Sequence, residues 1–200
     1  LYWGLYNPVE RPDVSFAANY LGGEKENYDA YTSGAPANDS DAQPWINVYE
    51  LANNILIGDI TLQQGYDEMS AQVNLTNLAD YVLLNLFIAN RDWYQNNWYA
   101  AKGRLPGDRF HFFCWDSEHM FAESSGTGAQ AILPPFIGSY NASGRLHFAM
   151  LEHPEYRMLF ADRIRKHLFN DGVLTSGPNI ARYQALADVL DRTVVAESAR

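Results

Sequence analysis

The segment that most constrains the fold is an almost continuously apolar run, residues 78–89. Thr76 or Asn77 stands just before it as a potential N-cap of a helix. Two sides of this helix are apolar, one with Leu78, Val82 and Leu86 and the other with Tyr81, Leu84 and Phe87. A helix that is apolar all round must be covered by other elements, so we expect residues 78–89 to lie at the centre of the packing.

Two β-like runs, residues 97–101 and 109–115, follow this helix and are joined by a turn that contains Gly and Pro. This pattern predicts an antiparallel hairpin. The order helix, loop, hairpin brings the start of the first strand and the end of the second strand to one place. Asp92 and Asn97 lie in the loop, and Asp116 follows the second strand. We therefore expect these three side chains to lie near one another.

Apolar periodicity and turn residues predict the other elements. Towards the N-terminus we expect a strand over residues 1–9, a helix over 14–20 stopped by Gly22-Gly23, a strand over 28–33 and a loop over 34–43. Further along we expect helices over 43–57 (capped by Asp41) and 61–72, a loop over 119–145, and helices over 154–169 and 178–198. Residues 1–200 are predicted to form a single α+β domain, because no repeat or change in composition marks a second one. Since the chain opens without Met and ends within a helical pattern, we expect a fragment of a longer chain.

The composition excludes several classes of protein. Apolar residues make up 47% of the chain and aromatic residues 14%, which excludes an intrinsically disordered protein. The 24 acidic and 14 basic residues give a formal charge of −10, which repels phosphate backbones, so we do not expect nucleic-acid binding. No stretch of 18 residues is uninterruptedly apolar, so we expect no membrane span.

The loop before the hairpin carries the clearest candidate chemistry. Asp92 and Asn97 stand five residues apart, as in a protein-kinase catalytic loop, where the Asp accepts a hydroxyl proton and the Asn holds Mg²⁺. Asp116 is a second candidate ligand, and Glu118 is an extra one on the same strand face. Alternatively, Asp92 and Asn97 only cap the helix and shape a turn, since Asp and Asn favour both positions.

A carbohydrate-active enzyme is another interpretation of these acidic residues. Asp116 and Glu118 could form the carboxylate pair of a glycoside hydrolase, and aromatic residues, which stack on sugars, are abundant. The sequence lacks the repeated barrel units that would strengthen this interpretation. Cys114, the sole cysteine, lies in an apolar run without an obvious His partner, so a nucleophilic triad is not predicted.

Several segments resemble, in the right order and over nearly the whole chain, the spore-coat protein H (CotH) kinase-like family. The matching segments are residues 2–7, 10–13, Asn90-Arg91-Asp92-Trp93, Asn96-Asn97-Trp98-Tyr99 and Trp115-Asp116-Ser117-Glu118. Residues 159–163, 169–172 and 196–200 look like the large bacterial surface proteins that carry this module. Several segments in order are more specific than the spacing of Asp92 and Asn97 alone.

The family is similar to atypical protein kinases, so the resemblance implies ATP and Mg²⁺ (or Mn²⁺) as cofactors and a protein substrate with Ser or Thr. It implies a kinase-like fold, mainly the helical lobe with a β-hairpin that carries the metal site, and an incomplete N-terminal lobe. By position, Asp92 would be the catalytic residue, Asn97 and Asp116 metal ligands, and Glu10 an acidic residue of the nucleotide site. The resemblance also implies a secreted or cell-envelope location.

One position departs from the family pattern. Relatives usually carry a Lys a few residues after the pair that stands here as Tyr28-Asp29, and this chain has Thr32 at that position. Thr cannot supply the cation that steadies nucleotide phosphates. Lys25, in the preceding turn, is the candidate nucleotide-binding cation instead. A second interpretation is therefore a catalytically weak or inactive pseudokinase or interaction module of a bacterial surface protein.

Overall fold

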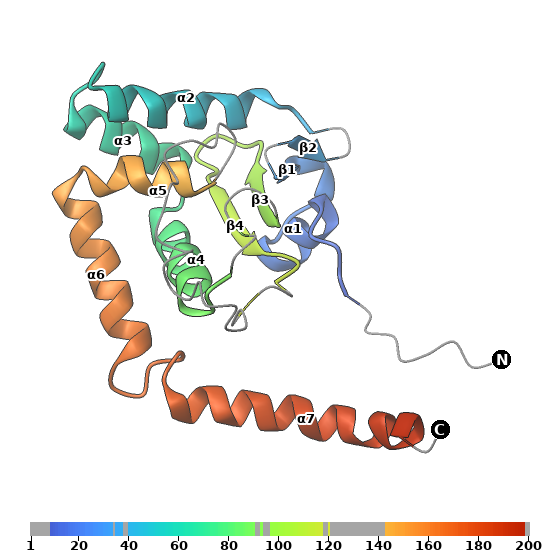
Figure 1. Ribbon diagram of the computed structural model, residues 1–200. Coiled ribbons are helices and arrows are strands. Elements are labelled where there is room, and N and C mark those ends of the chain that lie inside the picture. The colour runs from blue at the N-terminus through green and yellow to red at the C-terminus, as the bar shows by residue number, and fades with distance from the viewer. Residues whose placement is uncertain are drawn as a thin grey trace. The chain divides into compact units, whose positions relative to one another are not determined.

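The computed structural model divides into two compact units, residues 11–160 and residues 1–10 with 161–200. It describes residues 9–33, 35–37, 40–90, 93, 97–117, 120 and 143–198, without the side chains of residues 192, 193 and 195–198. Within these residues the chain forms seven α-helices and one four-stranded antiparallel sheet, which confirms an α+β fold (Figure 1). Residues 1–8, where a strand was predicted, lie outside the described residues.

The sheet consists of β1 (Tyr28–Thr32), β2 (Ala35–Ala37), β3 (Trp98–Gly103) and β4 (Phe110–Cys114), in the order β2-β1-β3-β4. The predicted hairpin of β3 and β4 and the predicted strand at β1 are confirmed. The loop predicted over residues 34–43 is partly wrong, because it contains β2. The Ala-Pro-Ala sequence of β2 lacks residues that favour strands, and its Pro is tolerated because β2 lies at an edge.

The register of the sheet determines which strand ends lie together. Thr32 of β1 pairs with Tyr99 of β3, and Trp98 pairs with Cys114 of β4. The last residue of β1, the first residue of β3 and the last residue of β4 are therefore at the same end of the sheet. We call this the Trp98 end. β1 begins at the opposite end.

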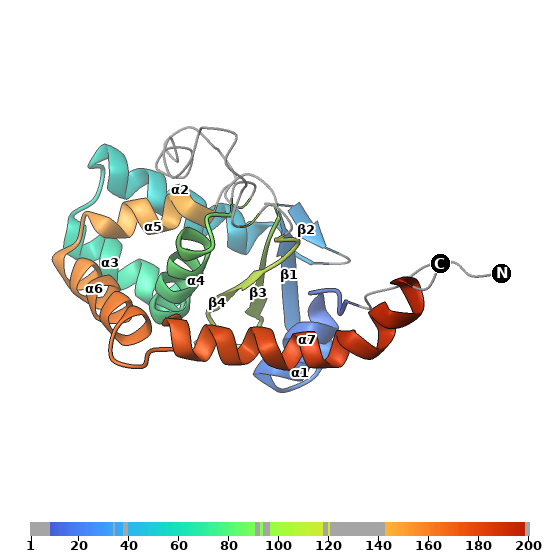
Figure 2. The same ribbon diagram turned by 60° about the horizontal axis from the view of Figure 1, so that its bottom comes forward.

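On one side of the sheet lies a layer formed by α2 (Gln43–Ile57), α3 (Leu62–Gln72), α4 (Leu75–Phe87) and α5 (Ser143–Leu151) (Figures 1 and 2). The core between this layer and the sheet is aromatic. The ring centroid of Trp45 lies 4.8 Å from that of Trp98 and 5.8 Å from that of Phe110. α4 is buried over most of its surface, as predicted, although Phe87 is 37% exposed.

The other side of the sheet is covered by α1 (Val14–Leu21), which agrees with the predicted helix over residues 14–20. Phe16 packs edge-on against Phe113 of β4, with ring centroids 5.1 Å apart. The Asp13 side chain caps the helix by accepting hydrogen bonds from the N–H groups of Ser15 and Phe16, at 2.7 and 3.2 Å. The short helix is thus fixed at its first turn and by an aromatic contact.

α2 and α3 lie where the sequence predicts them, but the predicted cap of α2 is wrong. Ala42 rather than Asp41 occupies the N-cap position. Asp41 still binds the helix, because its Oδ1 accepts a hydrogen bond from the Gln43 N–H at 2.9 Å. For α3, Thr61 is the N-cap.

α4 begins at Leu75, three residues before the predicted start at residue 78. Asn74 is its N-cap and accepts a hydrogen bond from the Asn77 N–H at 3.1 Å. The N–H of Asn74 itself donates to the main-chain O of Phe110 at 3.0 Å. This contact with β4 therefore fixes the chain just before the helix. Neither Thr76 nor Asn77, the two predicted caps, occupies the N-cap position.

α5 was not predicted. Its first three residues lie in the loop that was predicted over residues 119–145. Ser143 and Gly144 are weak helix formers, and burial of Leu146, Ala149 and Met150 outweighs this preference. Apart from Met120, the rest of that predicted loop lies outside the described residues.

α6 (Pro154–Leu168) and α7 (Ser176–Ser198) agree with the predicted helices. Asn170 and Asp171 form the turn between them with φ of 49° and 61°. In the part of the chain that the structure describes, no helix combines the length and the hydropathy that crossing a bilayer requires.

Candidate functional site

Asn97 and Asp116 lie together at the Trp98 end of the sheet. Asn97 directly precedes β3, and Asp116 follows β4 by two residues. The Asn97 Nδ2 donates a hydrogen bond to the main-chain O of Asp116 at 3.2 Å. The structure thus brings these two residues together, as the predicted hairpin implied.

Both residues have a left-handed backbone conformation, with φ of 51° for Asn97 and 50° for Asp116. Asn and Asp enter this region more readily than other residues with a side chain, but the conformation still costs free energy. Such conformations are concentrated at active sites and ligand clamps, where the surrounding structure holds them. This pair of positions is therefore a candidate for function rather than for folding alone.

The two side chains offer oxygen atoms of the kind that Mg²⁺ prefers, one from an amide and one from a carboxylate. Because the Asn97 Nδ2 donates to Asp116, its Oδ1 is the amide atom suited to a cation. No group of three His, Cys, Asp or Glu that could hold a metal ion occurs among the described residues. Asp92 and Glu118 lie outside those residues. Glu10 is exposed and belongs to the unit of residues 1–10 and 161–200, so its role stays a prediction.

The turn after α4 leads the chain towards these residues. The N–H of Ala89 donates to the O of Leu86 at 3.2 Å, and the N–H of Asn90 donates to the O of Asn85 at 3.0 Å. These are the two hydrogen bonds of a Schellman motif. Ala89 has a φ of 52° at a position where Gly is usual. α2 ends in the same pair of bonds around Gly58, whose φ of 79° carries no such penalty.

Trp93 anchors the loop between this turn and β3. Its side chain is 1% exposed and lies edge-on to the ring of Tyr81 in α4, with centroids 5.9 Å apart. A buried Trp contributes a large apolar contact area, so moving it out of the core is costly. The residue that follows Asp92 in the sequence is therefore held in the core.

Thr32 lies at the same end of the sheet as Asn97. It pairs with Tyr99, and the N–H of Ser33 donates to the O of Trp98 at 3.2 Å. Directly paired residues of antiparallel strands project from the same face, so Thr32 and Tyr99 both lie on the face covered by α1. The position at which the resemblance implies a Lys is therefore at the Trp98 end, and in this chain it holds an uncharged hydroxyl.

Lys25 lies at the opposite end of the sheet. It lines a pocket of about 420 Å³ together with Asp13, Ser15, Glu26, Tyr28, Ser40 and Arg104. Tyr28 is the first residue of β1, whereas Asn97 and Asp116 lie beside the last one. The structure therefore does not bring Lys25 next to this pair.

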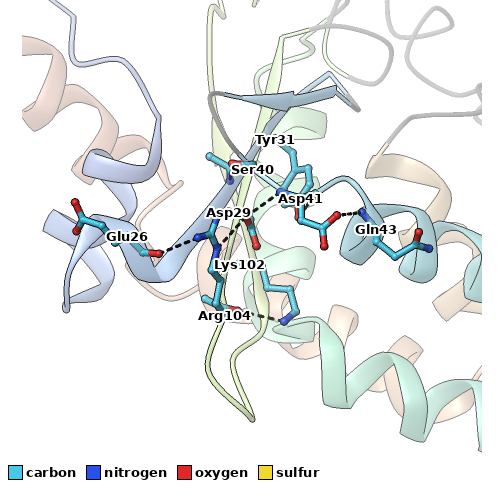
Figure 3. Close-up of polar contacts among 10 residues, drawn as sticks. Glu26, Asp29, Tyr31, Ser40, Asp41, Gln43, Lys102 and Arg104 are labelled. Carbon is cyan, nitrogen blue, oxygen red and sulfur yellow. Dashed lines mark hydrogen bonds and ion pairs between the residues drawn. The ribbon is translucent and has the colours of Figure 1, made fainter.

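The sequence analysis missed an ion pair at this opposite end. Asp29 is 4% exposed, and its Oδ1 accepts hydrogen bonds from Nη2 and Nε of Arg104 at 2.7 and 3.1 Å (Figure 3). The same oxygen accepts the Asp41 N–H at 3.0 Å, and Arg104 Nη1 donates to the O of Glu26 at 3.0 Å. Asp29 and Arg104 are 75 residues apart, so no local pattern indicates their contact. Their network joins β1, the turn between β3 and β4, and the start of α2.

Comparison with known proteins gives one result. A family model described as CotH kinase protein matches residues 1–198, which confirms the family resemblance derived from the sequence. Neither a curated protein nor a solved structure matches the chain. The matched range includes Asp92, Asn97, Asp116 and Thr32.

Proposed function

Because the chain belongs to the CotH kinase protein family, we propose that it is an atypical kinase that transfers phosphate from Mg-ATP to Ser or Thr of a secreted or cell-envelope protein. Mn²⁺ is the alternative metal ion. We further propose that residues 1–200 form one kinase-like domain that consists mainly of the helical lobe. In this domain the β3–β4 hairpin carries the metal site.

The single observation that carries this proposal is the contact between Asn97 and Asp116. The Asn97 amide binds the main-chain O of Asp116 where a strand begins and its neighbour ends, and both residues have left-handed conformations. Left-handed residues occur at ligand sites, and both of these carry side-chain oxygens of the kind that Mg²⁺ binds. Trp93, the residue that follows Asp92 in the sequence, is held in the core.

In the proposed reaction Asp92 accepts the proton of the acceptor hydroxyl. The hydroxyl oxygen forms a bond to the γ-phosphorus of ATP while the bond from that phosphorus to the β–γ bridging oxygen breaks, and ADP leaves. Asn97 and Asp116 are the proposed ligands of Mg²⁺, with Glu118 as an additional one. When bound, Mg²⁺ neutralises negative charge on the phosphates. The hydrogen bond holds the Asn97 amide against the main chain of Asp116 before substrate binds, and a group positioned in advance lowers the entropic part of the barrier.

A thermal-shift titration with ATP, with and without Mg²⁺ or Mn²⁺, tests the metal site. Asp116→Asn removes the charge but keeps a residue that tolerates the left-handed conformation. Asp171→Asn is the matched control, because Asp171 is also left-handed, with a φ of 61°, and lies in the turn after α6. At a hundredfold excess over Kd a ligand stabilises the folded state by about 2.7 kcal/mol.

We expect Mg-ATP to raise the melting temperature of the wild type and of Asp171→Asn. In Asp116→Asn we expect the metal-dependent part of this rise to be lost. An equal shift in Asp116→Asn would show that this residue is not a metal ligand. Absence of any shift in the wild type would contradict Mg-ATP binding itself. Phosphoryl transfer that survives in Asp92→Asn would exclude Asp92 as the base.

Thr32 favours a second candidate function, an inactive pseudokinase or an interaction module of a bacterial surface protein. This residue places a neutral hydroxyl at the Trp98 end, where the family pattern has a cation. The second candidate predicts no phosphoryl transfer by the wild type, so transfer by the wild type rejects it. A gain of transfer in Thr32→Lys would show that the site lacks only the cation. Weaker ATP binding in Lys25→Ala would instead support Lys25 as that cation.

The glycoside hydrolase interpretation depends on Asp116 together with Glu118, which lies outside the described residues. Membership of a kinase-like family favours phosphoryl transfer over this chemistry. Hydrolysis of a chromogenic glycoside that disappears in Glu118→Gln would be needed to support it.

A further inference from the structure

Two buried side-chain amides, Asn85 in α4 and Asn90 after the turn, are bonded to each other. Their residues are 1% and 2% exposed. Asn90 Nδ2 donates to Asn85 Oδ1 at 3.0 Å, and Asn85 Nδ2 donates to the O of Tyr81 at 2.9 Å and to the Sγ of Cys114 at 3.6 Å. The Asn85 amide thus uses both of its protons and its oxygen. This arrangement avoids the penalty of roughly 1–3 kcal/mol for an unsatisfied buried polar group.

The packing of α4 does not require an amide at position 85. The neighbouring residues of this helix are apolar, and an apolar residue at this position would leave no buried polar group to satisfy. The amide instead connects its own helix, the turn after it and β4. A buried amide whose polar groups are all satisfied in this way selects one arrangement of the segments that it joins.

Two of the segments that this network joins precede the candidate metal ligands in the sequence. Asn90 begins the stretch that leads to Asn97, and Cys114 precedes Asp116 by two residues. The hydrogen bond from Asn85 Nδ2 to the Sγ of Cys114 extends the network to the strand that precedes Asp116.

The backbone between the two amides is strained, and the hydrogen bonds on either side hold it in that conformation. Ala89 lies between Asn85 and Asn90 with a φ of 52°. Main-chain and side-chain hydrogen bonds, both of 3.0 Å, join the residues on either side of it. A strained residue persists only where its surroundings over-determine it, and such residues cluster at functional sites.

We propose that Asn85 and Asn90 form a clamp that positions Asn97 and Asp116 relative to each other and thereby sets the affinity of the site for a divalent cation. This inference rests on the proposed function, because it assumes a cation at Asn97 and Asp116. The two clamp residues are positioning residues rather than ligands. Loss of groups that orient metal ligands lowers metal affinity about 10–100-fold, and we expect an effect in this range.

The experiment measures the Kd for Mn²⁺ by electron paramagnetic resonance in wild type, Asn85→Leu, Asn90→Leu and the control Asn77→Leu. Asn77 belongs to the same helix and also binds β4, through the main chain of Phe112 at 2.6 and 3.3 Å, but farther from Asp116. Hydrogen exchange without metal is measured for the peptides that contain Asn97 and Asp116. Cys114→Ala, which removes one contact of the clamp, is a milder variant should Asn85→Leu not fold.

We expect Asn85→Leu and Asn90→Leu to raise the Kd by at least about tenfold and to speed exchange in both peptides. Cys114→Ala should raise the Kd less, and Asn77→Leu should lower the melting temperature with the Kd unchanged. An unchanged Kd in the clamp variants, or an equal rise in Asn77→Leu, overturns the inference. If the proposed function itself is wrong, the wild type binds no Mn²⁺, which distinguishes that result from failure of the clamp alone. Hydrogen exchange then decides. Unaltered exchange in Asn85→Leu rejects the clamp as well, whereas faster exchange in both peptides shows that the clamp still links the two segments.

Discussion

The side chain of Asn77 binds the main chain of Phe112 through both of its polar groups. The Phe112 N–H donates to Asn77 Oδ1 at 2.6 Å, and Asn77 Nδ2 donates to the O of Phe112 at 3.3 Å. β4 is an edge strand, and the amide takes the place of a neighbouring strand at this residue. Asn77 was predicted as a possible helix cap, and in the structure it instead attaches α4 to the sheet.

Asn77→Leu should lower the free energy of unfolding by about 1–3 kcal/mol, because the N–H and O of Phe112 lose their partner. The measurement is urea denaturation of the wild type and the variant. Asn47→Leu on the exposed surface of α2 is the control and should change stability by less than about 0.5 kcal/mol. Equal effects at both positions would contradict the role of the Phe112 contact.

Ala89→Gly should stabilise the fold by about 0.5–1 kcal/mol. Gly relieves a left-handed conformation that costs about 1–2 kcal/mol, and the greater entropy of its unfolded chain offsets part of this gain. Gly58→Ala is the converse change in the equivalent turn of α2. A Cβ at Gly58 would meet no atom within 4 Å, so only the backbone conformation opposes it. The melting temperature should rise in Ala89→Gly and fall in Gly58→Ala. A loss of stability in Ala89→Gly would contradict strain at Ala89.

His147 should make stability depend on pH below neutrality. Burial lowers the pKa of His147 from 6.5 to about 4, and its Nδ1 lies 2.9 Å from the Tyr156 hydroxyl oxygen. Between these values the unfolded chain binds more protons than the folded protein, so this contribution is complete above pH 6.5 and is lost as the pH falls to 4. The loss amounts to roughly 3 kcal/mol.

The measurement for His147 compares urea denaturation of the wild type and His147→Gln at pH 7.5 and pH 5. Other titrating groups are common to both proteins, so the difference between the two pH dependences isolates this residue. We expect the wild type to lose more stability than the variant between the two values. Parallel losses would show that His147 is not held neutral in the fold.

Arg104→Met should destabilise the protein by about 2–3 kcal/mol. The change leaves the buried carboxylate of Asp29 without its counter-charge, and the effect is below the usual 3–5 kcal/mol for a buried pair because the Arg104 side chain is 45% exposed. Lys25→Met is the control, because it removes an exposed ion pair. Lys25 Nζ lies 4.0 Å from Glu26 Oε1, and the two side chains are 59% and 70% exposed. We expect a change below about 0.5 kcal/mol for this surface pair in urea denaturation. Equal losses would contradict a stabilising role of the buried pair.

The elements that the sequence predicted well are those with a local signal. α2 shows apolar residues at helical spacing, and the predicted bounds agree with the structure. The sequence predicted that Asn97 lies near Asp116, because the order helix, loop, hairpin brings the start of one strand next to the end of the other. Their left-handed conformations could not be foreseen, because Asn and Asp are equally common in ordinary turns.

The features that the sequence did not reveal depend on distant contacts. The start of α4 is set by the bond from Asn74 to Phe110, and the ion pair of Asp29 joins residues far apart in the chain. The turn at Ala89 lacks the Gly that usually indicates such a turn. A signal did exist for Asn85, because a polar residue in a helix expected to be buried all round requires partners. The partners themselves could be found only in the structure.

The short edge strand β2 has a consequence for the behaviour of the protein at high concentration. β2 has three residues, and Pro36 at its centre has no N–H to offer to an incoming chain. At the other edge of the sheet, in β4, the Asn77 side chain is hydrogen-bonded to the main chain of Phe112. Both borders of the sheet therefore discourage recruitment of strands from a second molecule, so a protein substrate would have to be recognised by side chains rather than by extension of the sheet.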